Sequence, residues 1–217
     1  QAPARHIGPG PQDQGLAPRE PGRPKVVLIA SMHGNETAPR KILQVLRDGK
    51  QINGIDLWVV PTYNPDGAAA HPQERPRGRP EPQLPLPLGR PRRELRVRSK
   101  PASEPETRAM MKFLRDVDPD WILSFHQPLH GVDTDTKRPG FARKVGRHLD
   151  LPAKAFTCGG VCHGTMTMWF NHRFDGTALT VEYGDAPPRR LMRKKAPRQV
   201  LSIWGAWRGQ LGFGHVG

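Results

Sequence analysis

The chain has 217 residues, 35% of them hydrophobic, which is enough for one domain with a sizeable core. Its net charge of +14 raises nucleic acid and anionic surfaces as partners. No basic stretch is interleaved with aromatic residues and no apolar run is long enough to cross a bilayer, so we predict no nucleic-acid partner and no membrane span. The sequence shows no signal peptide and starts at Gln1 without Met, while Cys158 and Cys162 do not fix the redox compartment. Localisation and oligomeric state are therefore left open.

After an N-terminal segment at 1–24, an apolar run over 26–30 predicts a buried strand that begins a domain at 25–217. His33 and Glu36 follow its end, three residues apart. A ring nitrogen and a carboxylate are ligands that zinc accepts, so this pair predicts part of a metal site. The alternative is an ordinary connection to a helix over 37–48, with Asn35 as its cap and Glu36 in its first turn.

Further along the chain, polar residues again follow predicted strands. Asn64-Pro65-Asp66-Gly67 comes after a strand-like run at 57–63, and a helix is predicted over 104–117 with Ser103 as its cap. The next apolar run, 121–126, ends in His126. Together with His33 and Glu36, this residue completes the two-His, one-Glu set of a catalytic zinc site, which keeps a fourth position open for water.

A last strand-like run, 179–184, carries the single carboxylate Glu182. A carboxylate on a buried strand costs free energy unless it is paired or used, whereas one on a half-solvated edge strand does not. Alternating strands and helices predict an α/β fold, a three-layer sandwich with a largely parallel mixed central sheet. Ligands at the carboxyl ends of strands lie where such sheets bind substrates.

In this order the motifs resemble the zinc metallocarboxypeptidase family of the carboxypeptidase A type, most closely its small bacterial branch of murein peptide amidases. The resemblance covers about 25–70 and 101–209. It implies a zinc ion on His33, Glu36 and His126, and Glu182 as the base that takes a proton from water and returns it to the leaving amine. We also predict that His130 and His163 lie in loops near the site, where they either contact substrate or are ordinary solvent-exposed loop residues.

The family has an Arg after Asn-Pro-Asp-Gly that stabilises the oxyanion, and an Asn-Arg pair that grips the substrate's terminal carboxylate. Here the residues at 71–98 are rich in Pro and Arg, contain no Asp or Asn, and predict an irregular segment. With a suitable choice of codons, a one-base shift of this segment reads Thr-Arg-Lys-Asn-Ala-Arg-Gly-Val-Asp-Leu-Asn-Arg-Asn-Phe, which is the missing motif. We therefore interpret 71–98 as frame-slipped, and 8–19 as a second candidate slip.

Residues 71–98 contribute +5 of the net charge of +14, so part of the basic character of the chain comes from the segment interpreted as frame-slipped. The basic run at 189–195 is interpreted as a solvated helix face, with a patch for an anionic cell envelope as the alternative.

The sequence thus predicts a zinc-dependent metallocarboxypeptidase or peptide amidase that hydrolyses an amide bond in a carboxylate-terminated peptide, with a cell-wall peptide as the candidate substrate. Because the Arg and the Asn-Arg pair are missing, we expect impaired activity. The alternatives are a non-catalytic zinc-binding remnant of a damaged gene and a related zinc deacylase.

Overall fold

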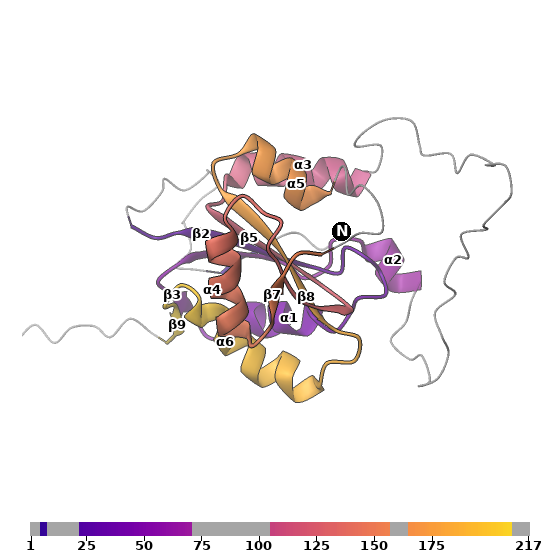
Figure 1. Ribbon diagram of the computed structural model, residues 1–217, viewed down its shortest axis with the longest axis vertical. Coiled ribbons are helices and arrows are strands. Elements are labelled where there is room, and N and C mark those ends of the chain that lie inside the picture. The colour runs from indigo at the N-terminus through magenta and orange to yellow at the C-terminus, as the bar shows by residue number, and fades with distance from the viewer. Residues whose placement is uncertain (1–4, 8–21, 71–104, 157–164, 210–217) are drawn as a thin grey trace, which may run out of the picture.

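The structure of the protein, a computed structural model, describes residues 5–7, 22–70, 105–156 and 165–209. A seven-stranded sheet lies between two layers of helices, and a two-stranded sheet lies beside it (Figure 1). The strands are β1 (Arg5–Ile7), β2 (Lys25–Ala30), β3 (Ile52–Asn53), β4 (Asp56–Val60), β5 (Trp121–His126), β6 (Leu129–Asp133), β7 (Ala153–Lys154), β8 (Thr177–Gly184) and β9 (Trp207–Arg208). The helices are α1 (Arg40–Asp48), α2 (Pro65–Ala70), α3 (Pro105–Val117), α4 (Pro139–Leu149), α5 (Met166–Arg173), the π-helix η1 (Leu191–Lys195) and α6 (Ala196–Ser202).

The large sheet has the strand order β1-β4-β2-β5-β8-β6-β7. Its centre, β4-β2-β5-β8, is parallel, whereas β1 and β6 run antiparallel to β4 and β8. The predicted sandwich with a largely parallel mixed sheet is therefore confirmed. Sequence analysis did not predict β1, which adds an edge strand from the N-terminal segment.

The central strands are mainly apolar because helices cover both of their faces. In β2, Val26 and Leu28 belong to a core cluster with residues of α1, whereas Val27 and Ile29 belong to a second cluster with residues of α3 and α5. All four side chains are fully buried. Helices α1, α4 and α6 thus cover one face of the sheet, and α3 and α5 cover the other (Figure 1).

The first helix starts later than its sequence pattern predicts, at Arg40 rather than at residue 37. Pro39 has no backbone N–H, and the N–H of Ala38 donates to the side chain of Gln127 at 3.1 Å, outside the helix. Asn35 is consequently not the cap of this helix and Glu36 is not in its first turn, so these two details of the alternative are wrong. The second predicted helix begins at Pro105.

Several sequence predictions lie outside the described residues: the irregular segment at 71–98, the second candidate slip at 8–19, the cap Ser103, the two cysteines and His163. No helix in the described ranges is both long and apolar enough to cross a membrane. His130 lies in β6 and not in a loop, because the strand begins at Leu129, directly after the Gln127–Pro128 peptide.

Candidate metal centre

Three parallel strands deliver the predicted site residues to one edge of the sheet. β2, β5 and β8 lie in the order β2-β5-β8, and His126 at the end of β5 is the register partner of Glu182 in β8. Directly after β2, the chain turns through Ser31, which adopts a φ of 54°, and then carries His33 and Glu36. A left-handed conformation at a residue other than glycine costs free energy and is found disproportionately at functional sites.

The side chains of His33, Glu36 and His126 converge. The Nδ1 atom of His33 lies 2.7 Å from Oε1 of Glu36, and Nδ1 of His126 lies 2.8 Å from the other carboxylate oxygen of Glu36. The two imidazole ring centroids are 5.1 Å apart. Glu36 thus bridges two ring nitrogens that both point to the same small volume.

This donor set fits a metal ion of the zinc type. One ligand atom from each of the three residues lies within 4.8 Å of the others. Tetrahedral ligands at about 2.1 Å from zinc are about 3.4 Å apart, so modest side-chain adjustments bring all three into coordination. Glu36 and His126 are buried, whereas His33 is 62% exposed, so the group is open to solvent on the His33 side.

Electrostatics inside the cluster favour a charged, deprotonated Glu36. Burial acts to raise the pKa of this carboxyl group, but hydrogen bonds from His126 and His33 outweigh burial and lower it. The hydrogen bond with Glu36 raises the pKa of His33, against a smaller opposing effect of burial. A carboxylate that stays ionised between two imidazoles is ready to exchange these hydrogen bonds for a cation.

Glu182 lies next to the cluster and does not belong to it. It is buried on an interior strand between β5 and β6, so the half-solvated edge-strand alternative is wrong. Its carboxylate accepts a hydrogen bond from the backbone N–H of Leu129 at 3.2 Å. Burial raises the pKa of Glu182, which moves the carboxyl group toward the range in which proton transfer at neutral pH is efficient.

A serine that sequence analysis missed supports the far side of one imidazole. The Oγ atom of Ser124 lies 2.8 Å from Nε2 of His126, and both residues are buried. Contact at Nε2 fixes the ring while Nδ1 faces Glu36, which is the usual arrangement around a metal-ligating histidine. The signal was present in the sequence, because residues two apart on a strand point to the same face.

Two glycines from separate motifs hold the loop after β2 in place. Gly34, between His33 and Glu36, packs directly on the backbone of Gly67, so that a Cβ atom on Gly34 would lie 2.2 Å from the Gly67 carbonyl carbon and oxygen. The Gly67 N–H donates to the Asn64 side chain at 2.7 Å. The Asn-Pro-Asp-Gly motif therefore has a structural use here: it lets α2 approach the ligand loop closely.

A second residue missed by sequence analysis, Gln127, links the segments around the centre. Its Oε1 accepts from Ala38, and its Nε2 donates to the carbonyl oxygens of Gly184 at 3.2 Å and Asp185 at 2.7 Å. These bonds connect the chain after Glu36 to the chain after Glu182, on either side of β5. Gln127 follows His126, so one short segment supplies a candidate ligand and the brace beside it.

The predicted contact of His130 with substrate stays a prediction. His130 is exposed, adopts a φ of 53°, and lines a cavity of about 320 Å³ together with Tyr183 and Pro187. Tyr183 faces away from Glu182 because neighbouring strand residues point to opposite faces, so this cavity lies on the other face of β8. The place of His163 lies outside the described residues.

Comparisons with known proteins agree with the fold and the motif. No protein-family model matches the chain. Carboxypeptidase D of Rattus norvegicus is 37% identical over 79 residues, which are 28% of this chain and 6% of that protein. Murein peptide amidase A of Escherichia coli is 34% identical over 53 residues, which are 24% of this chain and 22% of that protein. The crystal structure of murein-tripeptide amidase MpaA from Escherichia coli O157 superposes with a TM-score of 0.61 at 19% identity, covering 96% of this chain and 93% of that one.

The chain therefore has the carboxypeptidase-like α/β fold, and the resemblance to zinc carboxypeptidases that its motifs indicated is confirmed. Within that fold it is similar to murein peptide amidases in sequence and in structure. The sequence matches span less than a quarter of the length of these curated relatives, and the structural likeness at 19% identity establishes the fold and no more.

Proposed function

We propose that this protein is a zinc-dependent hydrolase of the carboxypeptidase A type, a metallocarboxypeptidase or peptide amidase that cleaves an amide bond in a carboxylate-terminated cell-wall peptide. The convergence of His33, Glu36 and His126 beside the buried Glu182 carries the proposal. The likeness to murein peptide amidase A and to murein-tripeptide amidase supports a cell-wall peptide as the substrate.

Each residue has a distinct task in this proposal. His33, Glu36 and His126 hold the zinc ion, which when bound supplies Lewis acidity toward a water and the scissile carbonyl. Glu182 takes a proton at its carboxylate and returns it to the leaving amine. Its burial and the N–H of Leu129 fix the position and the basicity of that carboxylate. Ser124 and Gln127 keep the imidazole and the flanking segments in place.

The oxyanion and the substrate's carboxylate require cationic donors, which the family supplies as an Arg after Asn-Pro-Asp-Gly and an Asn-Arg pair. Residues 71–98, which we interpret as frame-slipped, do not contain these motifs. An Arg fork binds a carboxylate in bidentate fashion, and losing one oxyanion donor costs about 10²–10³ in rate. We therefore propose that the present chain binds zinc and hydrolyses slowly. A non-catalytic zinc-binding remnant is the second candidate, and the altered composition of 71–98 favours it. A zinc deacylase is the runner-up among enzymes.

The test uses four proteins: the present chain, a chain in which the one-base shift across 71–98 is reversed, and the Glu182→Gln and matched Glu106→Gln variants of that restored chain. Zinc content is measured by metal analysis, and release of amino acid is measured from carboxylate-terminated cell-wall peptides before and after chelation. Glu106 is the control because it is a described glutamate that does not belong to the cluster.

We expect about one zinc per chain in all four proteins, and hydrolysis mainly in the restored chain. Glu182→Gln placed in the restored chain abolishes that hydrolysis, whereas Glu106→Gln leaves it unchanged. Absence of stoichiometric zinc from the present chain contradicts the metal centre. Equal hydrolysis by the present and restored chains contradicts the role given to the missing Arg and Asn-Arg pair.

A further inference from the structure

A group of cations lies on two segments that follow the site residues in the chain. Arg40 and Lys41 begin α1, four and five residues after Glu36. Arg189 and Arg193 lie before and within η1, seven and eleven residues after Glu182. None of the four forms an ion pair with another described residue. We call these four residues the cation cluster.

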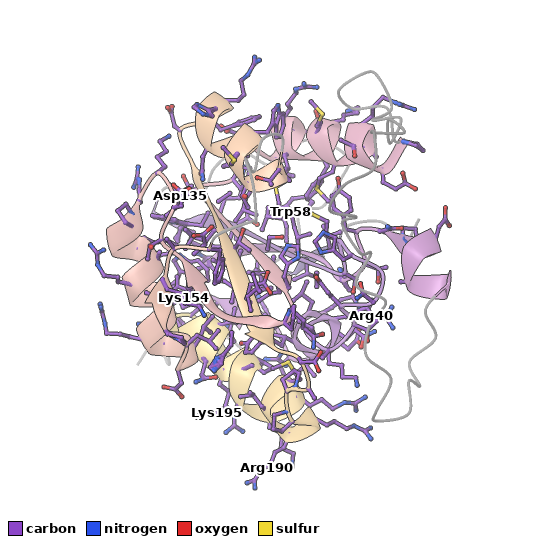
Figure 2. All side chains as sticks on the ribbon, turned by 45° about the vertical axis from the view of Figure 1, so that its right-hand side comes forward. Arg40, Trp58, Asp135, Lys154, Arg190 and Lys195 are labelled. Carbon is purple, nitrogen blue, oxygen red and sulfur yellow. The ribbon has the colours of Figure 1, made fainter. Side chains whose placement is uncertain are left out.

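The two segments that carry the cation cluster are held against each other. Helix α1 contacts η1, and Met192 of η1 joins the same core cluster as Ile42 of α1. Gln127 adds a polar link, because it binds both Ala38 and Asp185, the residues that lead into these segments. Figure 2 labels Arg40 of α1 and, lower in the view, Arg190 and Lys195 of the second segment.

The charges of the cation cluster act on one another. Burial lowers the pKa of Lys41, and the positive charges of Arg193, Arg189 and Arg40 lower it further. Like charges held together without an anion are unfavourable, and an anionic ligand relieves that repulsion. Asp185 is the one carboxylate in the connection from β8 to η1, and Lys195 is paired with Asp150 at 2.8 Å.

The position of the cation cluster relates it to the candidate metal centre. Helix α1 starts after the carboxyl end of β2, and the segment leading to η1 starts after the carboxyl end of β8. The same ends of these parallel strands present His33, Glu36 and Glu182. A substrate at the carboxyl edge of the sheet therefore has the cation cluster beside it, on the side of α1 and η1.

We propose that Arg40, Lys41, Arg189 and Arg193 form a subsite for additional carboxylates of the peptide substrate, and so select acidic peptides. The proposal rests on the proposed function for the identity of the substrate. Guanidinium groups suit it because they bind carboxylates with two parallel hydrogen bonds. An anionic membrane is the weaker partner, because the large hydrophobic side chains exposed among described residues are Leu129 and Trp207, neither of them in the cluster.

The experiment measures peptide binding to the metal-free full chain, so that it does not depend on hydrolysis. The probes are Ala-Glu-Glu and its neutral analogue Ala-Gln-Gln, which share a terminal carboxylate and differ in side-chain charge. Dissociation constants are taken from NMR titrations of the ¹⁵N-labelled protein at an ionic strength of about 0.01 M and again at about 0.15 M, where the Debye length falls from about 30 to about 8 Å.

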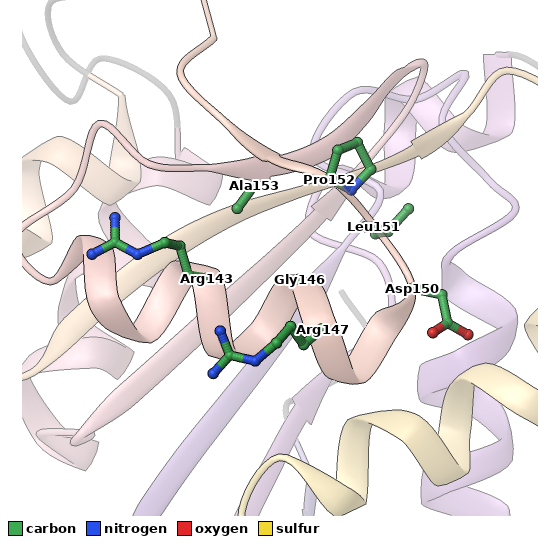
Figure 3. Close-up of a pocket in the computed structure, with 7 residues that line it drawn as sticks. All are labelled: Arg143, Gly146, Arg147, Asp150, Leu151, Pro152 and Ala153. Carbon is green, nitrogen blue, oxygen red and sulfur yellow. The ribbon is translucent and has the colours of Figure 1, made fainter.

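The test variant is Arg189→Glu/Arg193→Glu, and the control is Arg143→Glu/Arg147→Glu. Both change the net charge equally and replace exposed side chains. Arg143 and Arg147 lie on α4 and line a separate groove of about 470 Å³ with Pro152 and Ala153 (Figure 3). A general effect of net charge therefore acts in both variants, whereas loss of the subsite acts only in the first.

We expect Arg189→Glu/Arg193→Glu to weaken Ala-Glu-Glu binding about tenfold at low ionic strength, and less at high. Binding of Ala-Gln-Gln to this variant, and binding of both peptides to the control variant, should change less than twofold. Equal losses for the two peptides, or for the two variants, overturn the subsite. So does phosphatidylglycerol-vesicle binding that depends on Arg189 and Arg193 while peptide binding does not. If peptide binding is charge-selective but the restored chain does not hydrolyse peptides, the proposed function is refuted while the subsite is supported.

Discussion

The contact between Gly34 and Gly67 gives a sharp test of how the centre is held. In Gly34→Ala, the new Cβ atom would lie 2.2 Å from two backbone atoms of Gly67, whereas ordinary contact begins at 3.4 Å. Neither backbone can rotate away as a flexible side chain can, so the ligand loop and α2 must separate. Overpacking of this kind costs about 2–4 kcal/mol, which corresponds to a fall in melting temperature of roughly 5–15 °C for a chain of this size.

The same displacement should weaken zinc binding, because Gly34 lies between His33 and Glu36 and a ligand set tolerates shifts of only about 0.5 Å. We expect the zinc dissociation constant of Gly34→Ala to rise at least tenfold. The matched control is Gly140→Ala on α4, where an added Cβ atom meets nothing within 4 Å. Thermal unfolding and competition with a chromogenic chelator measure the two effects. A Gly34→Ala protein with the parental melting temperature and zinc affinity would show that this contact does not hold the ligand loop.

Three further predictions concern the centre itself. Ser124→Ala removes the 2.8 Å contact to His126 and should weaken zinc binding about 10–100-fold, as measured by chelator competition. The control Thr177→Val removes a buried hydroxyl without a partner and should leave zinc affinity unchanged. Equal zinc affinities of the two variants would exclude a positioning role for Ser124. Because burial raises the pKa of Glu182 above 4.5, the metal-free protein loses stability as the pH rises from about 4 through that pKa. Metal-free Glu182→Gln should therefore be more stable than the parent at pH 7 in urea unfolding, and the difference should vanish below about pH 4. A stability advantage of the variant confined to acid pH would contradict the predicted direction of this pKa shift. Zinc at about 100 times its dissociation constant should add about 2.7 kcal/mol to the free energy of unfolding, and a zinc-independent melting temperature in Glu36→Gln but not in the parent would locate that gain at the centre.

Local sequence patterns predicted much of the fold and the candidate site residues. Apolar runs at β2 and β5 predicted buried strands because both faces of a central strand must be covered, and that signal is local. The ends of those runs named His33, Glu36 and His126, since the residue after a parallel strand reaches the carboxyl edge of the sheet. Order along the chain, more than any single motif, indicated the carboxypeptidase-like fold that the structural comparison confirms.

Tertiary structure decided everything that depends on segments distant in sequence. The later start of α1 reflects a hydrogen bond from Ala38 to Gln127, 89 residues away, which no helical periodicity encodes. The interior position of β8, which buries Glu182, follows from pairing with β6 as well as β5. The close approach of Gly34 to Gly67, and the meeting of α1 with η1 that gathers the cation cluster, are likewise products of packing. Local sequence sets which residues can ligate or carry charge, whereas long-range packing sets which of them meet, because burial and contact are properties of the assembled core.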